Sequence, residues 1–538
     1  MLVFRRMGLA LGLSLAAATL ALSAGPGNTR AQTRPFLGPV PPPDCQPGDR
    51  TEKGVDGQLT AAERASGAST QPYHCNLAIV GEYAGQGAGH QLMWYGHCAY
   101  VTAEGYEAGQ KEVPPLLHPG IQVLDVSNQS DPKYSTNLDD PASLYDWEDG
   151  SVNAGRALLG TAESWMGSGP QPAVAFYDLT DCAHPRLLAG VQLPDANLLA
   201  HGGNFAFDGR TYWISALANA HVSAIDVSDP THPKELIDWN FPNGQAGGVG
   251  AHQACHRISL NQFTVDGHPP GTLLFCGVVG QMVRPGVFSS GNGLVIYDVS
   301  DVQNRRPHPV IRVVSSLYWK NGNIAIQPDL AFIHGKAFLG VGDEFGAGGG
   351  DYPKAAIRAC SAGLPPYGME RLLDISDVAR PKLVAQLMIG VDDPKNCAQT
   401  ENDITATMGG YGYSDHDCTF DNPRDAKLLA CSGHQAGVRV FDVHDPYRPR
   451  EIAYFVGPAP PDPNEIDPGS LLNSFQRIKP PINFAWSKAH SRFVWQDGQL
   501  YLWVISSHGG FYTLRFENRQ QIANLHPVPT PGNEDYQD

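Results

Sequence analysis

A short phrase recurs six times in this 538-residue chain, and it constrains the fold more than any other feature. Each copy is an apolar, β-branched run that ends in Asp, followed by an apolar residue and usually Ser or Thr; a Pro and a second apolar run come next. A repeated unit of this kind predicts a repeat architecture. The copies are IQVLDVS (121–127), VAFYDLT (174–180), VSAIDVS (222–228), LVIYDVS (294–300), RLLDISD (371–377) and VRVFDVH (438–444).

Each interval between successive phrases holds about four strand-like runs separated by Gly, Asn, Asp and Pro. The clearest repeat unit is 200–241, which contains NFAFDG, RTYWISAL, HVSAIDVS and PKELIDWNF. Four antiparallel strands of this length match one blade of a β-propeller. The Asp of the phrase, or the Ser two residues on, can bond backbone N–H groups where the third strand ends, so we interpret both as structural.

The end of the chain supplies a seventh, incomplete blade. Residues 484–498, 499–507 and 509–517 provide three strands, and the isolated run CNLAIVGEY (75–83) resembles the outer strand of other blades. Sharing a blade between the two ends removes free sheet edges. The sequence therefore predicts an all-β, seven-bladed propeller over 75–517, although six or eight blades stay open.

The amino-acid sequence of the repeat resembles that of the LVIVD-repeat family of secreted bacterial propeller proteins, over roughly residues 75–517. The resemblance rests on the six phrases and implies a propeller fold. It transfers no catalytic residue, because the motif of the family is the turn of a blade and not a site.

The first 31 residues predict an export signal. Arg5 and Arg6 precede an apolar stretch over 7–22, and small residues at 29–31 offer a cleavage position. A membrane anchor is the alternative, but the apolar run is short for a full span. We expect a periplasmic or secreted protein without a membrane span, with polar segments at 32–74 and 518–538 flanking the propeller.

The formal net charge of −17, with few basic clusters, limits the partners. Nucleic-acid binding relies on neutralising phosphates, and anionic membranes attract basic segments, so we expect neither partner. An unidentified protein, a glycan or a small molecule stays possible as a ligand.

Ten cysteines are an even number, as an oxidising compartment favours. Cys255 and Cys276 fall on the first and second strands of blade four, and Cys418 and Cys431 take the same places in blade six, so each pair can form a disulfide. Cys360 and Cys397 lie in two long insertions and are expected to join. Metal ligation by thiols is the alternative, but no Cys-x-x-Cys occurs. The sequence does not pair Cys45, Cys75, Cys98 and Cys182.

Long insertions gather on one face of the predicted ring. The links between blades and the loops that join second to third strands lie on this face, which we call the upper face. Long loops on a rigid scaffold are where binding and catalysis are usually placed. The insertions are 137–150, 279–293, 344–368, 389–411 and 456–481.

Six histidines fall on the same side of the ring, at or just before inner strands or directly after second strands. Neutral imidazole is a common ligand of copper, iron and zinc, so histidines that converge at the channel predict a metal site. Asp343 and Glu344, in GVGDEFGAG, could add oxygen ligands. The six histidines are His201, His252, His416, His490, His434 and His508.

Ordinary hydrogen-bonded histidines are the competing interpretation, because the chain has nineteen and a slip of one residue reverses a strand side chain. Four histidines are expected in turns or on the surface: His184, His232, His256 and His444.

Two functions are compatible with this pattern. The chain contains no HExxH and no GxSxG motif, which favours a secreted or periplasmic binding protein that presents its upper face to a ligand. The alternative is a copper-, iron- or zinc-dependent enzyme, such as an oxidoreductase, with a histidine-ligated site at the central channel. The sequence assigns no catalytic residue, substrate or reaction type.

Overall fold

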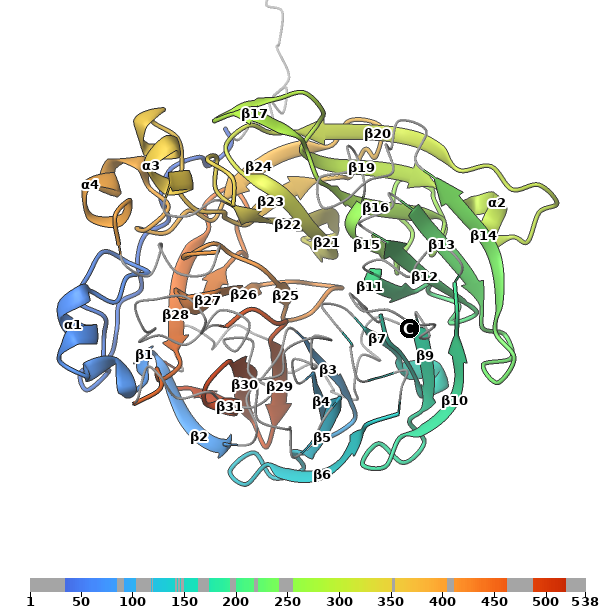
Figure 1. Ribbon diagram of the computed structural model, residues 1–538, viewed down its shortest axis with the longest axis horizontal. Helices are drawn as coiled ribbons and strands as arrows, with labels where there is room; N and C mark the ends of the chain where they lie inside the picture. Colours follow the sequence, from blue (N-terminus) through green and yellow to red (C-terminus); the bar gives the residue numbers. More distant parts are fainter. Residues whose placement is uncertain are drawn as a thin grey trace, which may run out of the picture. The chain divides into compact units, whose positions relative to one another are not determined.

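A computed structural model of the chain shows seven small antiparallel sheets that follow one another around a central axis (Figure 1). This arrangement is a seven-bladed β-propeller, as the repeat predicts. The structure describes residues 34–518 except 85–90, 103–117, 119, 141–142, 144–145, 147–149, 163–173, 194–199, 217–220, 241–254, 351–353, 404–410 and 462–486.

The blades are numbered in chain order, and each is given from its inner strand outward. Blade one holds β3 (Leu92–Tyr95), β4 (Cys98–Thr102), β5 (Ile121–Asp125) and β6 (Lys133–Leu138). Blade two holds β7 (Ser151–Asn153), β8 (Leu158–Gly160), β9 (Val174–Asp178) and β10 (Arg186–Val191). Blade three holds β11 (Ala200–Phe205), β12 (Thr211–Ala216), β13 (His221–Asp226) and β14 (Lys234–Asn240). Blade four holds β15 (Cys255–Leu260), β16 (Leu273–Val278), β19 (Gly293–Asp298) and β20 (Arg312–Tyr318).

Blades five to seven complete the ring, and blades six and seven each receive a strand from the N-terminal part of the chain. Blade five holds β21 (Asn323–Ile333), β22 (Lys336–Phe345), β23 (Arg371–Asp374) and β24 (Lys382–Gln386). Blade six holds β25 (Cys418–Phe420), β26 (Leu428–Gly433), β27 (Gly437–Asp442), β28 (Arg450–Val456) and, outermost, β1 (Tyr73–Cys75). Blade seven holds β29 (Arg492–Gln496), β30 (Gln499–Ser506), β31 (Gly510–Phe516) and β2 (Leu77–Tyr83).

The remaining elements are short and lie before β1 or in the connections between the blade strands. None of the helices in the described ranges is long and apolar enough to cross a membrane. These remaining elements are the hairpin β17 (Met282–Arg284) and β18 (Val287–Phe288), the helices α1 (Ala61–Ala65), α2 (Ser300–Gln303), α3 (Lys354–Ser361) and α4 (Cys397–Thr400), and the 3-10 helices η1 (Ala68–Thr70), η2 (Ala154–Arg156) and η4 (Pro394–Asn396).

The aspartate of each repeated phrase ends the third strand of its blade, as expected. In all six copies its carboxylate accepts a hydrogen bond, 2.8–3.0 Å long, from the backbone N–H two residues further on. The apolar residue between them is buried in the core. This local turn stops the strand and directs the chain to the outer strand, which explains why the phrase recurs once per blade.

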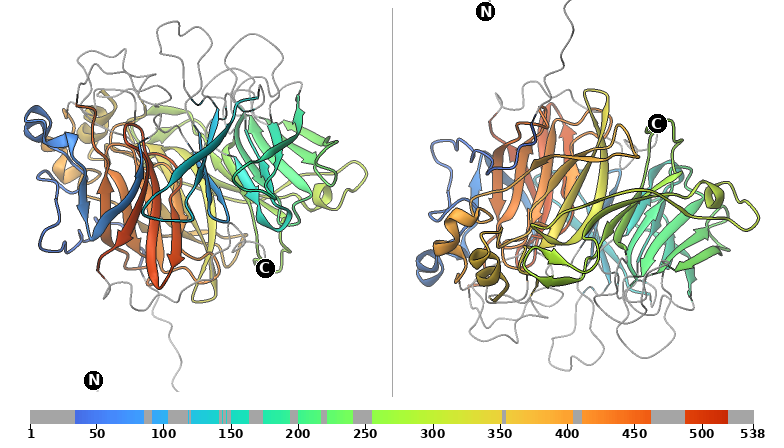
Figure 2. Two further views of the ribbon diagram at one scale, coloured as in Figure 1. Left: turned by 90° about the horizontal axis from the view of Figure 1, so that it is seen from below. Right: turned by 90° about the horizontal axis from the view of Figure 1, so that it is seen from above.

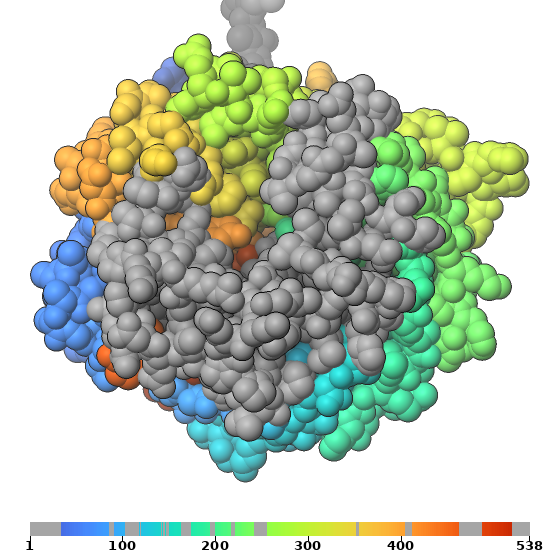
Figure 3. Space-filling view, in the orientation of Figure 1, coloured from blue at the N-terminus to red at the C-terminus, as the bar shows by residue number. Residues whose placement is uncertain are grey.

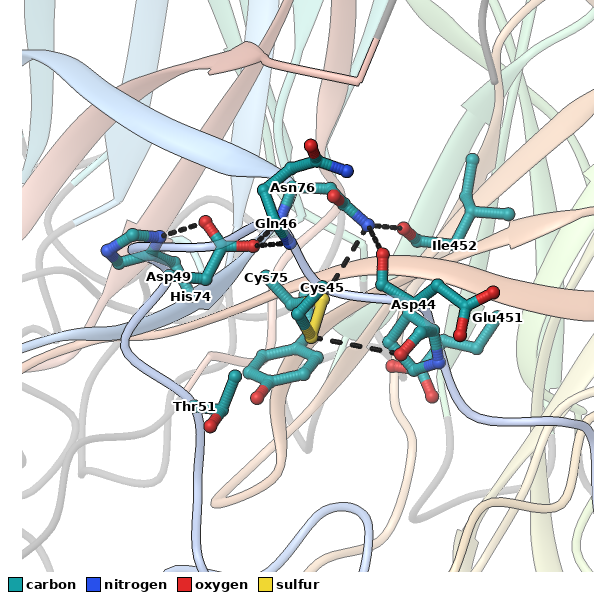
Figure 4. Close-up of a disulfide and its surroundings, with 12 residues drawn as sticks. Asp44, Cys45, Gln46, Asp49, Thr51, His74, Cys75, Asn76, Glu451 and Ile452 are labelled. Atoms are coloured by element: carbon teal, nitrogen blue, oxygen red, sulfur yellow. Dashed lines mark hydrogen bonds and ion pairs between the residues drawn. A yellow bond between two sulfur atoms is a disulfide. The ribbon is translucent and has the colours of Figure 1, made fainter. Parts of the chain in front are cut away.

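The ring closes as the sequence predicts, with one difference. β2 pairs antiparallel with β31, and Leu77 lies opposite Phe516. Cys75, however, belongs to β1, which pairs with β28 of blade six. Asn76 between them adopts a left-handed φ of 58°, and its side chain donates to the carbonyl oxygen of Ile452 (Figure 4). This single residue moves the chain from blade six to blade seven.

A substitution at Gly81 on β2 tests the closure of the ring. A Cβ at this position would lie 2.2 Å from the carbonyl oxygen of Gln129, which belongs to the turn after β5 of blade one. We expect Gly81→Ala to lower the free energy of unfolding by about 1–3 kcal/mol in chemical denaturation, because the clash is with backbone. Gly38→Ala is the matched control, since a Cβ there meets nothing within 4 Å. Equal stability of the two variants would contradict the closure.

Five disulfides join all ten cysteines. Three are the pairs expected from strand position and insertions, so metal ligation by free thiols does not arise. The fourth ties β4 of blade one to the turn after β9 of blade two, and the fifth ties the N-terminal part of the chain to β1 (Figure 4). The pairs are Cys255–Cys276, Cys360–Cys397, Cys418–Cys431, Cys98–Cys182 and Cys45–Cys75.

Residues 35–72, which we call the N-terminal strap, lie along the outer side of blades five and six. Phe36 forms a parallel bridge with Ala385 of β24. The Arg64 guanidinium pairs with the Asp403 carboxylate at 2.6 Å. Figures 1 and 2 show α1 beside α3 and α4 at this edge. The strap therefore braces the link between blades five and six, which leads to the candidate site.

Candidate functional site

Four histidines and one glutamate from four consecutive blades meet near the axis of the propeller, and we call them the axial cluster. All five side chains are buried. They lie on inner strands, at the upper end of a second strand, or in the links directly beside such strands. The members are His201 on β11, His256 on β15, Glu344 on β22, His416 before β25 and His434 after β26.

His201 and His256 occupy the same place in neighbouring blades, since each is the second residue of its inner strand. Their Nε2 atoms lie 2.7 Å apart. At this distance one imidazole nitrogen donates and the other accepts, so the two rings share one proton between their Nε2 atoms. Blades three and four thus present a contiguous pair of imidazoles.

Glu344 connects this pair to blade six. Its Oε2 lies 3.7 Å from Nε2 of His256, and its Oε1 lies 3.7 Å from Nε2 of His416. These distances are too long for hydrogen bonds. Two ligands bonded to one ion at about 2.1 Å and at tetrahedral to trigonal angles lie about 3.4–3.6 Å apart, so each pair taken separately is near the spacing of two ligands on one ion. The ligand atoms of His256, Glu344 and His416 do not all lie within 4.8 Å of one another.

The ring of His416 is held in a defined orientation and tautomer. Its Nδ1 lies 3.1 Å from the carbonyl oxygen of Lys488 and 3.2 Å from a carboxylate oxygen of Asp417. Both partners are acceptors, so Nδ1 carries the proton and Nε2 presents its lone pair toward Glu344. Nδ1 of His434 donates in the same way to the carbonyl oxygen of Ser414 at 2.6 Å. Histidines that bind metals typically use their second nitrogen like this.

Asp417 and Arg257 form a fully buried ion pair behind His416. Burial opposes ionisation of this carboxyl, but Arg257 and His416 hold the pKa of Asp417 well below its usual range. Asp417 is therefore a carboxylate at neutral pH, and it orients the N–H of His416.

Aromatic stacking fixes His434. Its ring lies 4.6 Å from the Tyr411 ring at an interplanar angle of 9°, and Tyr411 stacks in turn on Phe345. The ammonium of Lys488, a buried residue, lies 5.1 Å from the centre of the Tyr411 ring. This packing places the His434 ring edge-on to His416, with ring centres 5.4 Å apart.

The structure brings together only some of the residues predicted for the site. His201, His416, His434 and Glu344 join the axial cluster. His490 lies next to the Asp417 carboxylate, and its Nε2 lies 3.9 Å from one of the carboxylate oxygens. Its Nδ1 bonds the carbonyl oxygen of Cys418 at 3.0 Å. His508 is half-buried in the turn after β30. His252 lies outside the described residues.

The prediction that Asp343 adds an oxygen ligand beside Glu344 is wrong. Its carboxylate accepts from Nε1 of Trp319 at 2.9 Å and pairs with the Arg371 guanidinium. Successive side chains of a strand point to opposite faces, so Asp343 turns away from the axis when Glu344 points to it.

The prediction of a turn or surface position for His256 is also wrong, since this residue is 1% exposed and belongs to the cluster. A signal was present, because aligning AHGGNF (200–205) with CHRISL (255–260) places His256 in the column of His201. His184, His232 and His444 are exposed, as expected.

A cavity of about 120 Å³ lies on the axis, and we call it the axial cavity. Its walls come from the inner strands of blades one to six and from His490. The face seen in Figure 3 carries the hairpin β17–β18 and α3, so it is the upper face. In the described part of the chain, the groupings of three or more possible metal ligands within 4.8 Å of one another all include disulfide cysteines, and the axial cluster is not one of them. The axial cluster is the candidate metal centre because of the chemistry of its buried imidazoles and carboxylate.

Comparison with known proteins finds only distant structural similarity. No family model and no curated protein matches the chain. A putative 6-phosphogluconolactonase from Bacteroides fragilis is similar in structure, with a TM-score of 0.44, 10% identity and coverage of 75% of this chain and 86% of the other. A functionally unknown protein from Desulfotomaculum acetoxidans has a TM-score of 0.40, 9% identity and coverages of 68% and 86%. A protein from Lactobacillus plantarum has values of 0.41, 12%, 68% and 88%.

Proposed function

We propose that the protein is an exported β-propeller that binds a transition-metal ion at the axial cluster. His201, His256 and His416 would supply nitrogen ligands and Glu344 an oxygen ligand, a donor set suited to copper, iron or zinc. The Nε2 atoms of His201 and His256 lie 2.7 Å apart, so the two rings would have to separate to about 3.4–3.6 Å to bind one ion. The observation that carries the proposal is the position of Glu344, whose two oxygens each lie 3.7 Å from an imidazole nitrogen of a different blade.

The surroundings of the cluster support this function. The Nδ1 atoms of His416 and His434 donate to carbonyl oxygens, and Nε2 of His416 would be the ligating nitrogen of its ring. A cation would also displace the proton that His201 and His256 share, so binding should release protons and weaken as the pH falls. A bound ion would supply a Lewis acid or a redox centre at the upper face.

The proposed site of action is the periplasm or the cell exterior. Five disulfides support an oxidising compartment. The charged and apolar pattern of residues 1–31 supports export.

Metal analysis of tag-free protein tests the proposal. We expect about one copper, iron or zinc ion per wild-type chain, and a loss of affinity of at least about 100-fold in His416→Ala. Glu344→Gln is a second variant that keeps the side-chain shape and removes the charge, and it should also bind more weakly. His232→Ala, at a side chain that is 78% exposed, is the matched control and should bind normally.

Circular dichroism would show that each variant is folded before its metal content is compared. Wild-type protein that takes up no ion from buffered copper, iron or zinc would contradict the proposal. Equal metal content in all four proteins would contradict it as well, because the ion would then lie elsewhere.

A further inference from the structure

The axial cavity is separate from the axial cluster and has a chemistry of its own. The buried Arg257–Asp417 ion pair packs behind His416, while the cavity extends along the inner strands. Apolar side chains such as Phe205, Leu260 and Leu330 form part of its wall. The remaining wall carries polar groups, and one of them, Gln327, has a buried acceptor without a hydrogen-bond donor among the described residues.

Gln327 is the clearest of these polar groups. Its side chain is 9% exposed and lines the cavity. Its Nε2 donates to Oδ1 of Asp329 at 3.2 Å, which fixes the orientation of the amide. Its buried Oε1 accepts no hydrogen bond from the described residues. A buried acceptor without a donor is unfavourable, so this oxygen points to a ligand that donates.

Asp329 and His490 add further acceptors. Nδ1 of His490 bonds the Cys418 carbonyl, which leaves its Nε2 as an acceptor in the neutral ring. Burial raises the pKa of Asp329 to about 7, against the opposing effects of Gln327 and Arg257. The ionisable groups that interact electrostatically with Asp329 are Arg257, Asp417 and Glu370, and burial holds the pKa of Glu370 well above its usual range. When Asp329 is ionised, its charge adds to an Arg257–Asp417 pair that is neutral in sum, so this wall carries a net negative charge.

We propose that the axial cavity binds a small organic ammonium ion. The N–H groups of the ion would donate to Gln327 Oε1 and the Asp329 carboxylate, and its alkyl part would pack against the apolar wall. A cavity of about 150 Å³ holds benzene, so the volume here suits a ligand of about four to six non-hydrogen atoms. The proposal does not require a metal ion in the axial cluster.

Propylamine is the probe, and propan-1-ol and glycerol are neutral comparisons. Titration calorimetry or ligand-observed NMR on the full chain at pH 8 should show saturable binding of propylamine with a Kd on the order of 1 mM. Asp329→Asn should weaken it at least tenfold, and Gln327→Met should weaken it less. Binding should also weaken as the pH falls below about 7, because protonation of Asp329 removes its charge.

Two controls separate this site from the metal centre. His416→Ala should keep normal propylamine binding even if it loses metal, and His232→Ala should leave both unchanged. Absence of saturable binding, or equal binding by folded Asp329→Asn, would overturn the proposal. Tighter binding of glycerol than of propylamine would also overturn it, since the cavity would then select polyols.

Discussion

Replacement of Arg439 by methionine is expected to lower the free energy of unfolding by roughly 3–5 kcal/mol. Arg439 is fully buried in blade six, and its guanidinium contacts Glu52 at 2.9 Å, Glu451 at 3.2 Å and Asp56 at 3.3 Å. Removing the only cation of this group leaves three carboxyls without compensation, which is a large penalty in a buried site. Because Glu52 and Asp56 belong to the N-terminal strap, the strap should detach from blade six before the ring unfolds.

The pH dependence distinguishes lost charge compensation from lost packing. Burial raises the pKa of Glu451 and of Glu52 even with Arg439 present, and Arg439 opposes the shift. In the variant these pKa values rise further, so the folded state binds more protons than the unfolded state and stability falls as the pH rises. The loss of stability should therefore be larger at pH 8 than at pH 5, by up to about 1.4 kcal/mol per pH unit for each additional proton bound.

Denaturant unfolding at both pH values measures this effect. Arg380→Met is the matched control, since its ion pair with Asp377 is on the surface and its side chain is 81% exposed; we expect a change within about 0.5 kcal/mol. Adding Glu451→Gln to Arg439→Met should restore part of the lost stability. A variant whose stability loss does not depend on pH would show that Arg439 acts through packing alone.

The fold could be predicted from the sequence because its determinants are local. The carboxylate of each phrase aspartate accepts a hydrogen bond from an N–H only two residues away. A short stretch of sequence that contains the phrase is therefore enough to predict the turn. The outer-strand pattern of residues 75–83 is equally local and indicated the shared blade. Only the switch at Asn76 was missed, because one left-handed residue leaves no periodic signal.

The attachments of the N-terminal strap could not be predicted. Arg439 meets Glu52 across 387 positions of sequence, and Arg64 meets Asp403 across 339. Charged residues at such separations have many possible partners, and only the folded blades select one. The same reason kept the pairing of Cys98 with Cys182 open.

The sequence predicted which candidate residues lie at the ends of strands, but it did not predict the directions in which their side chains point. His201 and His416 were placed correctly, since inner strands of a propeller face the axis. The errors at Asp343 and His256 both come from the two-residue period of a strand, where adjacent positions point in opposite directions. Column-by-column comparison of the blades resolves this period for His256, while Asp343 needs its partners Trp319 and Arg371 to be known.

Removal of the Cys98–Cys182 disulfide is expected to destabilise the protein by about 4.5 kcal/mol, the chain-entropy value for its sequence separation of 84. The bond joins the first residue of β4 in blade one to the turn after β9 in blade two, so it holds neighbouring blades together. The Tyr100 hydroxyl donates to the carbonyl oxygen of Cys182 at 3.0 Å and would persist without the bond. The loss should therefore arise mainly in the unfolded chain, which gains freedom.

The Cys418–Cys431 disulfide is the internal standard for this prediction, because it closes a separation of only 13 within blade six. The same relation gives about 2.9 kcal/mol for it, so the two double-alanine variants should differ by about 1.6 kcal/mol at 25 °C. Denaturant unfolding of both variants, with the other four disulfides confirmed by thiol titration, measures the difference. An equal loss, or a larger loss for Cys418→Ala/Cys431→Ala, would show that the bonds stabilise the folded blades directly, because constraint of the unfolded chain must favour the longer loop.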